Sequence, residues 1–199
     1  CAGQDLKEVT GEDAPPLEDI VGGSYNTTVR KMRALAKPVI TAVNGVAAGA
    51  GANIALAGDL CVAAESAKFI QAFSKIGLIP DSGGTWMLPK LVGLQRATAL
   101  AYLGTPVGAP AAEAMGMIHR SIPNADFSAE VQALAETLAN MPTRGLALTK
   151  QAFNQGFEQS MDAQLDTEME LQATASRTGD FKEGVAAFLE KRKPTFKGH

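Results

Sequence analysis

Asp81 is the residue whose type and surroundings best suit it to move a proton. Its sequence neighbours are largely apolar: Phe73, Ile76, Leu78, Ile79, Trp86 and Met87. Apolar surroundings disfavour the charged form of a carboxylate and raise its pKa toward neutrality, where it can act as a general base. The alternative is structural, because Pro80-Asp81-Ser82-Gly83 has an ordinary turn composition and Asp81 or Ser82 could cap the next helix.

A glycine-rich stretch, Gly49-Ala50-Gly51, lies between a predicted strand and a predicted helix. It resembles part of a dinucleotide-binding fingerprint, but the third small position falls on Ile54 and no convincing ribose-binding acid follows. The small residues could instead serve only close packing. A third interpretation is an oxyanion site, because a loop that enters a helix presents unpaired N–H groups to a negative oxygen.

Other residue types that often carry chemistry lack a suitable context. His119 is the only internal histidine and has no nucleophile near it in the sequence, so we interpret it as structural. Ser74 and Ser82 lack the setting of a nucleophile elbow, which argues against a serine hydrolase. The spacing of Cys1 and Cys61 predicts neither a disulfide framework nor a metal site. We therefore expect no metal and a reducing, cytoplasmic setting.

The composition is that of one globular domain with a mildly acidic surface. The chain has 199 residues, 46% hydrophobic and 20% charged, which is enough for a sizeable core. A net charge of −3 and a pI near 5.4 lack the basic field that nucleic-acid binding needs, so no nucleic-acid partner is expected. The longest weakly polar stretch, Pro38–Ala64, is interrupted by Asn44, Asn53 and Asp59, and we expect no membrane segment.

The elements around the two candidate features follow an α/β pattern. Apolar spacing predicts a helix over residues 24–36, which Lys37-Pro38 ends, and a second helix over residues 49–57. Short β-branched runs predict three strands: Val39–Val43, Leu60–Ala63 and Lys68–Ile70. Such alternation indicates parallel strands. The loop chemistry of Gly11–Gly23 predicts a surface excursion with little to bury.

The part of the chain beyond Gly83 is predicted to be mostly helical. Helices are predicted over residues 84–92, 94–103, 109–116, 128–140, 143–156, 160–178 and 180–192. His119 falls in a predicted strand, Ile118–Ile122. Asp180-Phe181-Lys182-Glu183 has the spacing of a capping box and predicts the start of the last helix.

Several motifs occur in a fixed order along the chain: Ala2-Gly3-Gln4-Asp5-Leu6, Lys37-Pro38-Val39-Ile40-Thr41-Ala42-Val43-Asn44-Gly45, Gly49-Ala50-Gly51, Gly83-Gly84-Thr85 and Ala111–Ile118. By this ordered set the chain resembles the crotonase, or enoyl-CoA hydratase/isomerase, superfamily. The resemblance implies a spiral of ββα turns over residues 1–125, incomplete at its N-terminus, and a helical region over residues 126–199 that covers the CoA site and mediates oligomerisation. It also implies an acyl-CoA substrate, no separate cofactor because CoA is part of that substrate, and a homotrimer or dimer of trimers.

The resemblance assigns binding roles near the N-terminus. The backbone N–H groups of Ala2 and Ala50 would form the hole for the thioester oxygen, where negative charge develops in an enolate. The segment Ala2-Gly3-Gln4-Asp5 would also line the CoA site. These roles agree with the oxyanion interpretation of the glycine-rich stretch.

The resemblance also indicates which reaction to expect. Hydratases of the family use two glutamates, whose positions are taken here by Asn53, a polar helper, and Phe73, an apolar pocket wall. Ordinary hydration is therefore not expected. Asp81 stands where several family isomerases carry their catalytic acid. One carboxylate suffices for isomerisation, because the same group can remove a proton from one carbon and return it to another.

Within the superfamily, the run from Gln71 to Trp86 looks most like that of the ring 1,2-epoxyphenylacetyl-CoA isomerases of phenylacetate catabolism. That resemblance implies rearrangement of an epoxidised aromatic ring to an oxepin. An aliphatic enoyl-CoA isomerase or enoyl-CoA hydratase is the alternative, and a crotonase-fold RNA-binding or scaffold protein is the non-enzymatic one. Filter binding with RNA beside a CoA-binding assay would separate the last from the others.

A basic cluster near the end of the chain has two interpretations. Lys191-Arg192-Lys193 and Lys197 could meet the phosphates of CoA. They could equally form a solvated helix end, where cations favour the C-terminal dipole. The sequence does not decide between the two.

Overall fold

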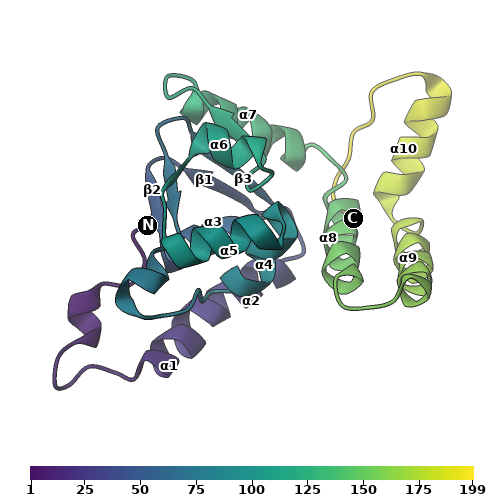
Figure 1. Cartoon of the computed structure of the whole chain (residues 1–199). Helices are drawn as coiled ribbons and strands as arrows, with labels where there is room; N and C mark the ends of the chain where they lie inside the picture. Colours follow the sequence, from purple (N-terminus) through teal and green to yellow (C-terminus); the bar gives the residue numbers. More distant parts are fainter. The chain divides into compact units, whose positions relative to one another are not determined.

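The computed structural model describes residues 1–199 and places them in two compact units. Unit 1 contains Cys1–Met32 and Ile40–Val131, and unit 2 contains Arg33–Val39 and Gln132–His199. All the strands belong to unit 1 (Figure 1). Asp81 and the glycine-rich stretch therefore lie in the mixed α/β unit.

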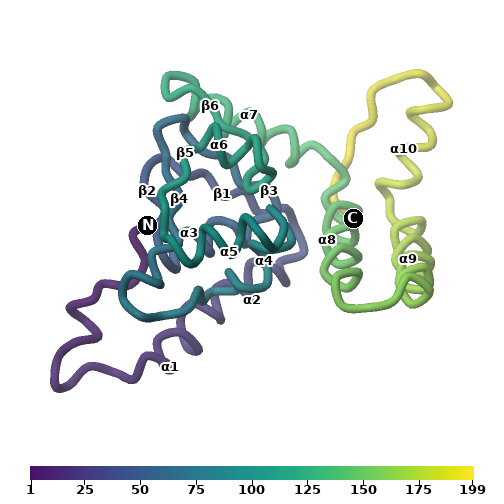
Figure 2. The backbone as a smooth tube through the Cα atoms, viewed as in Figure 1, coloured from purple at the N-terminus to yellow at the C-terminus, as the bar shows by residue number.

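Unit 1 contains two three-stranded sheets (Figure 2). The first is wholly parallel and is formed by β1 (Ile40–Val43), β3 (Leu60–Ala64) and β6 (Arg120–Ile122). The second is formed by β2 (Val46–Ala48), β4 (Lys68–Ile70) and β5 (Val107–Gly108), with β2 and β4 parallel and β4 and β5 antiparallel. The sequence indicated four of these strands, β1, β3, β4 and β6, and the predicted parallel pairing is confirmed for them, although β4 also pairs antiparallel with β5. Strands β2 and β5 were not predicted from the sequence, because these strands are too short to show the alternation of apolar and polar residues that marks a strand.

Helices cover these strands within unit 1. Helix α3 (Ala50–Leu56) contacts β1, β2 and α4 (Gly84–Val92), and α4 contacts α5 (Leu94–Leu103). Helix α6 (Ala109–Ala114) contacts strands β4 to β6. Helix α7 (Phe127–Ala139) follows β6, and its residues from Gln132 onward belong to unit 2. The bounds predicted for α4 and α5 agree with the structure. Both helices are bordered by glycines with positive φ, at residues 83, 93 and 104, which mark their ends in the sequence.

The segment predicted as a loop over Gly11–Gly23 is partly helical, and that prediction is wrong for its second half. Helix α1 (Leu17–Ile20) continues into a π-helical turn, Val21–Tyr25, and then into α2 (Asn26–Ala34). The apolar residues Leu17 and Val21 are one helical turn apart, a spacing that favours a helix despite the two glycines that follow. The chain therefore approaches α2 as one nearly continuous helical run.

Small buried residues let the elements of unit 1 approach each other closely. Ala52 and Val62 have no exposed surface, and Gly51 is also buried. A Cβ atom on Gly51 would lie 2.2 Å from the carbonyl oxygen of Cys1. The close-packing interpretation of the glycine-rich stretch is thus correct for Gly51. It is compatible with a second role for the neighbouring Ala50.

Unit 2 consists mainly of three helices, α8 (Thr143–Gly156), α9 (Met161–Ala175) and α10 (Gly179–Glu190). The predicted capping box at the start of α10 is wrong, because the cap is Thr178, whose hydroxyl accepts a 3.1 Å hydrogen bond from Phe181 N–H. The buried carboxylate of Asp180 instead accepts the N–H groups of Lys197 and Gly198, at 2.7 and 2.8 Å. It ties the C-terminal tail to α10.

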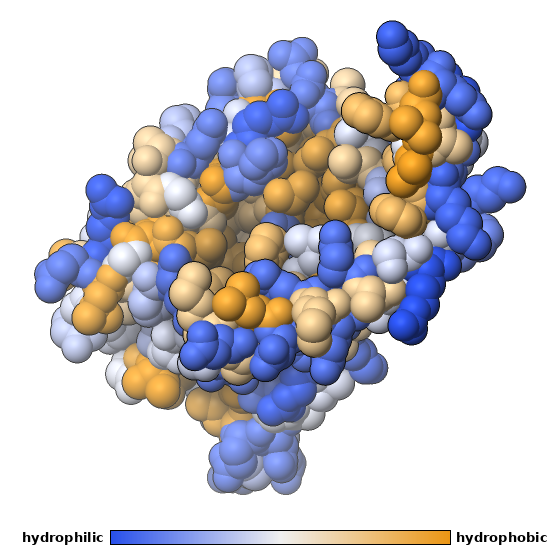
Figure 3. Space-filling view, turned by 90° about the vertical axis from the view of Figure 1, so that its right-hand side faces the viewer, coloured by the Kyte–Doolittle hydropathy of each residue, from blue (hydrophilic) through white to orange (hydrophobic).

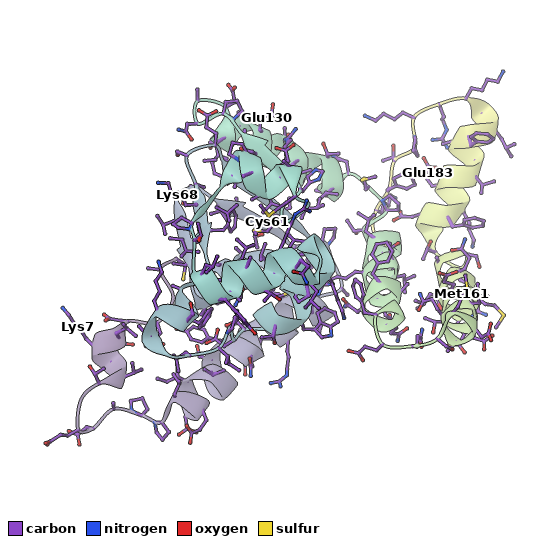
Figure 4. All side chains as sticks on the ribbon, in the orientation of Figure 1. Lys7, Cys61, Lys68, Glu130, Met161 and Glu183 are labelled. Carbon is purple, nitrogen blue, oxygen red and sulfur yellow. The ribbon has the colours of Figure 1, made fainter.

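Unit 2 exposes large apolar side chains. Along α9, Met161, Leu165 and Met169 keep 80%, 54% and 64% of their surface exposed, so this stripe is not core within the chain. Met161 points outward in Figure 4, and hydrophobic surface is visible on the face drawn in Figure 3. None of the helices combines the length and apolar character that a membrane crossing needs.

Candidate functional site

The N-terminal segment lies against β2 and the glycine-rich loop. The terminal amino group of Cys1 donates to the carbonyl of Val46, and the N–H of Ala48 donates to the carbonyl of Cys1, both at 3.0 Å. Gly3 has a φ of 87°, and a Cβ atom there would lie 3.3 Å from the amide nitrogen of Ala50. The structure therefore brings together the Ala2-Gly3 segment and Ala50, as the resemblance implied.

The N–H group of Ala50 is the first of α3 and, like that of Ala2, has no hydrogen-bond partner within the chain. The N–H groups of a first helical turn have no carbonyl partner in the helix. Gly49 allows the sharp entry into the helix with a φ of 55°, and its own N–H is taken by the carbonyl of Ile70 at 2.9 Å. Two free amide donors thus lie on neighbouring segments, which is what an oxyanion hole requires.

Asp81 opens a tight turn that leads into α4. Its carbonyl accepts the N–H of Gly84 at 2.8 Å, and Ser82 and Gly83 both adopt left-handed backbone, with φ of 52° and 79°. Left-handed backbone is costly at a non-glycine residue such as the buried Ser82 and is found most often at functional sites. The N-cap of α4 is Gly83, without a side-chain cap, so the carboxylate of Asp81 does not cap the helix.

The carboxylate of Asp81 is half-buried and lies in an environment that disfavours its charge. Burial raises the pKa of Asp81 above its ordinary value of 3.8. A hydrogen bond of 2.8 Å from the hydroxyl of Ser82 to Oδ1 offsets part of this effect, because it favours the charged form. Burial outweighs the hydrogen bond, and the group is shifted in the direction that suits a general base.

Asn53 holds the backbone of the turn, not the carboxylate. Its side chain has no exposed surface, and its Nδ2 donates to the carbonyl of Asp81 at 2.9 Å. Its Oδ1 accepts a 2.8 Å hydrogen bond from Nε2 of the buried Gln71. A Cβ atom on Gly84 would lie 2.1 Å from Asn53 Nδ2, so the turn packs directly on this amide. Gln71 was not among the residues predicted from the sequence.

Phe73 lies in the 3-10 helix Ala72–Ile76 and is buried. A Cβ atom on Gly49 would lie 3.9 Å from the tip of its ring, so the ring packs beside the glycine-rich loop. An apolar ring at this place can neither accept nor donate a proton. Phe73 thus lies beside Gly49 and is not among the residues that line the pocket next to Asp81.

A pocket of about 500 Å³ opens beside Asp81. Its walls come from the helical run that leads into α2 and from the first residue of α2 (Leu17, Glu18, Val21 and Asn26), and from the segment around Asp81 (Leu78, Ile79, Pro80, Ser82, Gly83 and Thr85). Most of this lining is apolar, and the exposed Glu18 is the one other acid in it. The contribution from α1 could not be predicted from the sequence, because this helix is only one turn long.

Tyr25 links the N-terminal segment to the neighbourhood of Asp81. Its hydroxyl donates to Oε1 of Gln4 at 2.6 Å, and Nε2 of Gln4 donates to Glu8 at 2.9 Å. Burial raises the pKa of Tyr25, and the negative charges of Asp81 and Glu8 raise it further. Asp5, in contrast, caps the 3-10 helix Leu6–Val9 by accepting the N–H of Lys7 at 3.0 Å.

The other residues considered in the sequence analysis are not among those that line this pocket. His119 is exposed next to β6, and Cys61 is buried inside unit 1, where burial raises the pKa of its thiol (Figure 4). No three His, Cys, Asp or Glu side chains cluster as metal ligands would. In unit 2, Arg192 pairs with Glu183 at 2.6 Å and with Glu190 at 2.5 Å, an arrangement typical of a solvated helix end.

Comparison with known proteins agrees with this geometry. The whole chain, residues 1–199, matches the protein-family model described as enoyl-CoA hydratase/isomerase. A 1,2-epoxyphenylacetyl-CoA isomerase from Escherichia coli strain K12 is 50% identical over 201 residues, which cover 100% of this chain and 77% of the relative. A Rhodobacter capsulatus protein named "Probable enoyl-CoA hydratase" is 45% identical over 198 residues, with the same coverage of 100% and 77%.

The fold is also shared with solved structures. An enoyl-CoA hydratase from Bacillus anthracis superposes with a TM-score of 0.92 at 34% identity, covering 100% of this chain and 77% of that structure. Likeness at this level, over the full length, confirms the predicted crotonase fold. The chain therefore belongs to the enoyl-CoA hydratase/isomerase family.

Proposed function

We propose that this chain isomerises an acyl-CoA thioester and that Asp81 moves the proton. As a member of its family it is an enzyme that acts on CoA thioesters. The observation that carries the isomerase proposal is the half-buried carboxylate of Asp81, whose raised pKa and place beside an apolar pocket suit proton transfer. Asn53 and Phe73, at the positions of the two hydratase glutamates, have no carboxylate to activate water.

The proposed mechanism uses two parts of the site in turn. Asp81 removes a proton from a carbon activated by the thioester, and the electrons move onto the thioester oxygen as an enolate. The N–H groups of Ala2 and Ala50 hydrogen-bond that oxygen where its negative charge develops, which lowers the barrier. Asp81 then returns the same proton to another carbon, so that substrate and product have the same atoms.

We further propose ring 1,2-epoxyphenylacetyl-CoA as the substrate, with the oxepin-CoA as product. The carbon–carbon bond of the epoxide breaks so that the ring expands to seven members, and Asp81 moves one proton from the carbon beside the thioester carbonyl to a ring carbon, so that substrate and product are isomers. Support comes from the 50% identity to the Escherichia coli isomerase of that name and from the apolar walls of the pocket, which suit an aromatic ring. The alternative is an aliphatic enoyl-CoA isomerase, which would need the same oxyanion hole and acid. Turnover on a panel of aromatic and aliphatic CoA thioesters tests this choice, and a clear preference for aliphatic 3-enoyl-CoA would reject the aromatic assignment.

Replacing Asp81 by Asn should lower turnover about a hundredfold or more, the usual scale for removing general base catalysis. Binding of the CoA thioester should change little. Thermal stability should not fall, because a carboxylate whose pKa is raised by folding destabilises the folded state once it is ionised at neutral pH. Turnover and thermal midpoint are measured on the same preparation.

Glu18→Gln is the matched control for Asp81→Asn, because Glu18 is an exposed acid that lines the same pocket. We expect it to retain most of the turnover. Normal turnover in Asp81→Asn would remove Asp81 from the mechanism. An equal loss in Glu18→Gln would show that the reaction uses two acids and would contradict the single-acid proposal.

Hydration of crotonyl-CoA should be negligible. Activation of water in the family depends on a pair of carboxylates, and the amide of Asn53 is already engaged by Asp81 and Gln71. Formation of the 3-hydroxy product can be followed by loss of the enoyl absorbance. A rate typical of an efficient enzyme, roughly ten per second or more, would establish a hydratase instead.

We also propose that the protein assembles as a homotrimer or a dimer of trimers. The apolar stripe of Met161, Leu165 and Met169 is exposed within the chain, and exposed apolar surface of this kind commonly marks an interface. Sedimentation velocity of the protein at micromolar concentration should show a trimer or hexamer. A monomer throughout the concentration range would reject the assembly.

A further inference from the structure

The hydroxyl of Tyr25 anchors the segment that carries the Ala2 N–H group. Cys1 is fixed by its hydrogen bonds to Val46 and Ala48, but the backbone of Ala2 and Gly3 makes no hydrogen bond within the chain. The next fixed point along the segment is the side chain of Gln4, which accepts the hydroxyl of Tyr25 at 2.6 Å. The Ala2 amide thus lies between two residues that hydrogen bonds hold in place: Cys1, bonded to Val46 and Ala48, and Gln4, bonded to Tyr25.

The position of Tyr25 follows from the π-helical turn. Tyr25 is the last residue of the π-helical turn Val21–Tyr25. The first residue of the turn, Val21, and the residue after Tyr25, Asn26, both line the pocket beside Asp81. A π-turn inserts one extra residue into a helix and changes the direction of the side chains that follow, and such turns are frequent at functional sites. The turn ends at Tyr25, whose hydroxyl reaches Gln4 in the N-terminal segment, while Val21 and Asn26 line the pocket.

The phenol of Tyr25 is held in its neutral, hydrogen-bond-donating form. Burial raises its pKa above 10.0, and the nearby carboxylates of Asp81 and Glu8 act in the same direction. Gln4 is fixed in turn, because its Nε2 donates to Glu8 at 2.9 Å. The two hydrogen bonds that link Tyr25, Gln4 and Glu8 therefore persist at the pH at which an enzyme of this kind works.

We infer that Tyr25 is a positioning residue of the enzyme: its hydroxyl, through Gln4, holds the Ala2 N–H group opposite that of Ala50, where the thioester oxygen would bind. The inference rests on the proposed function, because it concerns the oxyanion hole. The oxyanion hole stabilises charge that develops in the transition state. Less precise positioning of one of its two N–H donors therefore affects the chemical step more than substrate binding.

Tyr25→Phe should lower kcat about tenfold with little change in KM, less than the hundredfold or greater loss known for deleting a direct oxyanion donor. Tyr102→Phe is the matched control, because Tyr102 is the only other tyrosine and is 76% exposed. Gln4→Met removes the acceptor of the same hydrogen bond, and the double variant with Tyr25→Phe should be no slower than the slower single variant.

Unchanged kcat in Tyr25→Phe, a change confined to KM, or multiplicative losses in the double variant would each overturn the inference. Failure of the proposed function is seen separately, as normal turnover in Asp81→Asn. Normal turnover in Asp81→Asn would reject the proposed function, and the positioning role of Tyr25, which depends on that function, would be rejected together with it.

A spectroscopic titration tests the placement of Tyr25 without any turnover. In the Tyr102→Phe background Tyr25 is the only tyrosine, so phenolate absorbance reports it alone. Its titration midpoint should lie above 10.0 and should fall when Asp81→Asn removes the neighbouring negative charge. A midpoint that does not respond to Asp81→Asn would show that Tyr25 does not face Asp81 and would contradict the geometry on which the inference depends.

Discussion

The buried side-chain amide of Asn53 is the interaction on which the geometry of the site depends. It joins three separate parts of unit 1, because it lies on α3, donates to the carbonyl of Asp81 and accepts from Gln71 after β4. Breaking one of these hydrogen bonds would leave a fully buried polar group unsatisfied, at a cost of about 1–3 kcal/mol. The same helix begins at Ala50, three residues earlier, so one helical turn fixes the distance between the free amide of Ala50 and the turn of Asp81.

The carboxylate of Asp81, the proposed base, is subject to two opposing influences on its pKa. Burial beside apolar side chains raises its pKa, whereas the hydroxyl of Ser82 limits that rise. The left-handed backbone of Ser82 is the conformational cost of placing that hydroxyl against the carboxylate, and the packing of Gly84 on Asn53 keeps the turn in this form. Asn53 thus holds the backbone of Asp81, and the side chain of Asp81, which accepts the hydroxyl of Ser82, lines the pocket.

The elements with long, regular patterns could be predicted from the sequence, and the parts that depend on contacts between distant residues could not. The bounds of α4 and α5 follow from apolar spacing closed by glycines, and the pairing of Ala50 with the Ala2-Gly3 segment follows from the family resemblance. The one-turn helix α1 is too short for its apolar residues to show a helical period in the sequence. Gln71 and Tyr25 acquire their roles only through hydrogen bonds to residues 18 and 21 positions away.

One local prediction failed because a partner distant in the sequence took the group concerned. Asp180 has the right spacing for a capping box, but the N–H groups of the C-terminal tail bind its carboxylate and Thr178 caps the helix instead. Sequence patterns describe what a residue can do locally, and the competing long-range partner decides which of these it does.

The pH dependence of kcat/KM tests the central claim, that Asp81 is a base made effective by burial, most directly. The profile for the free enzyme reports the pKa of its essential base. Because burial raises the pKa of Asp81, activity should fall as the pH drops through a midpoint above 3.8, and this acid limb should be absent from the residual activity of Asp81→Asn. An acid limb with its midpoint at or below 3.8, or one that persists unchanged in Asp81→Asn, would contradict the account.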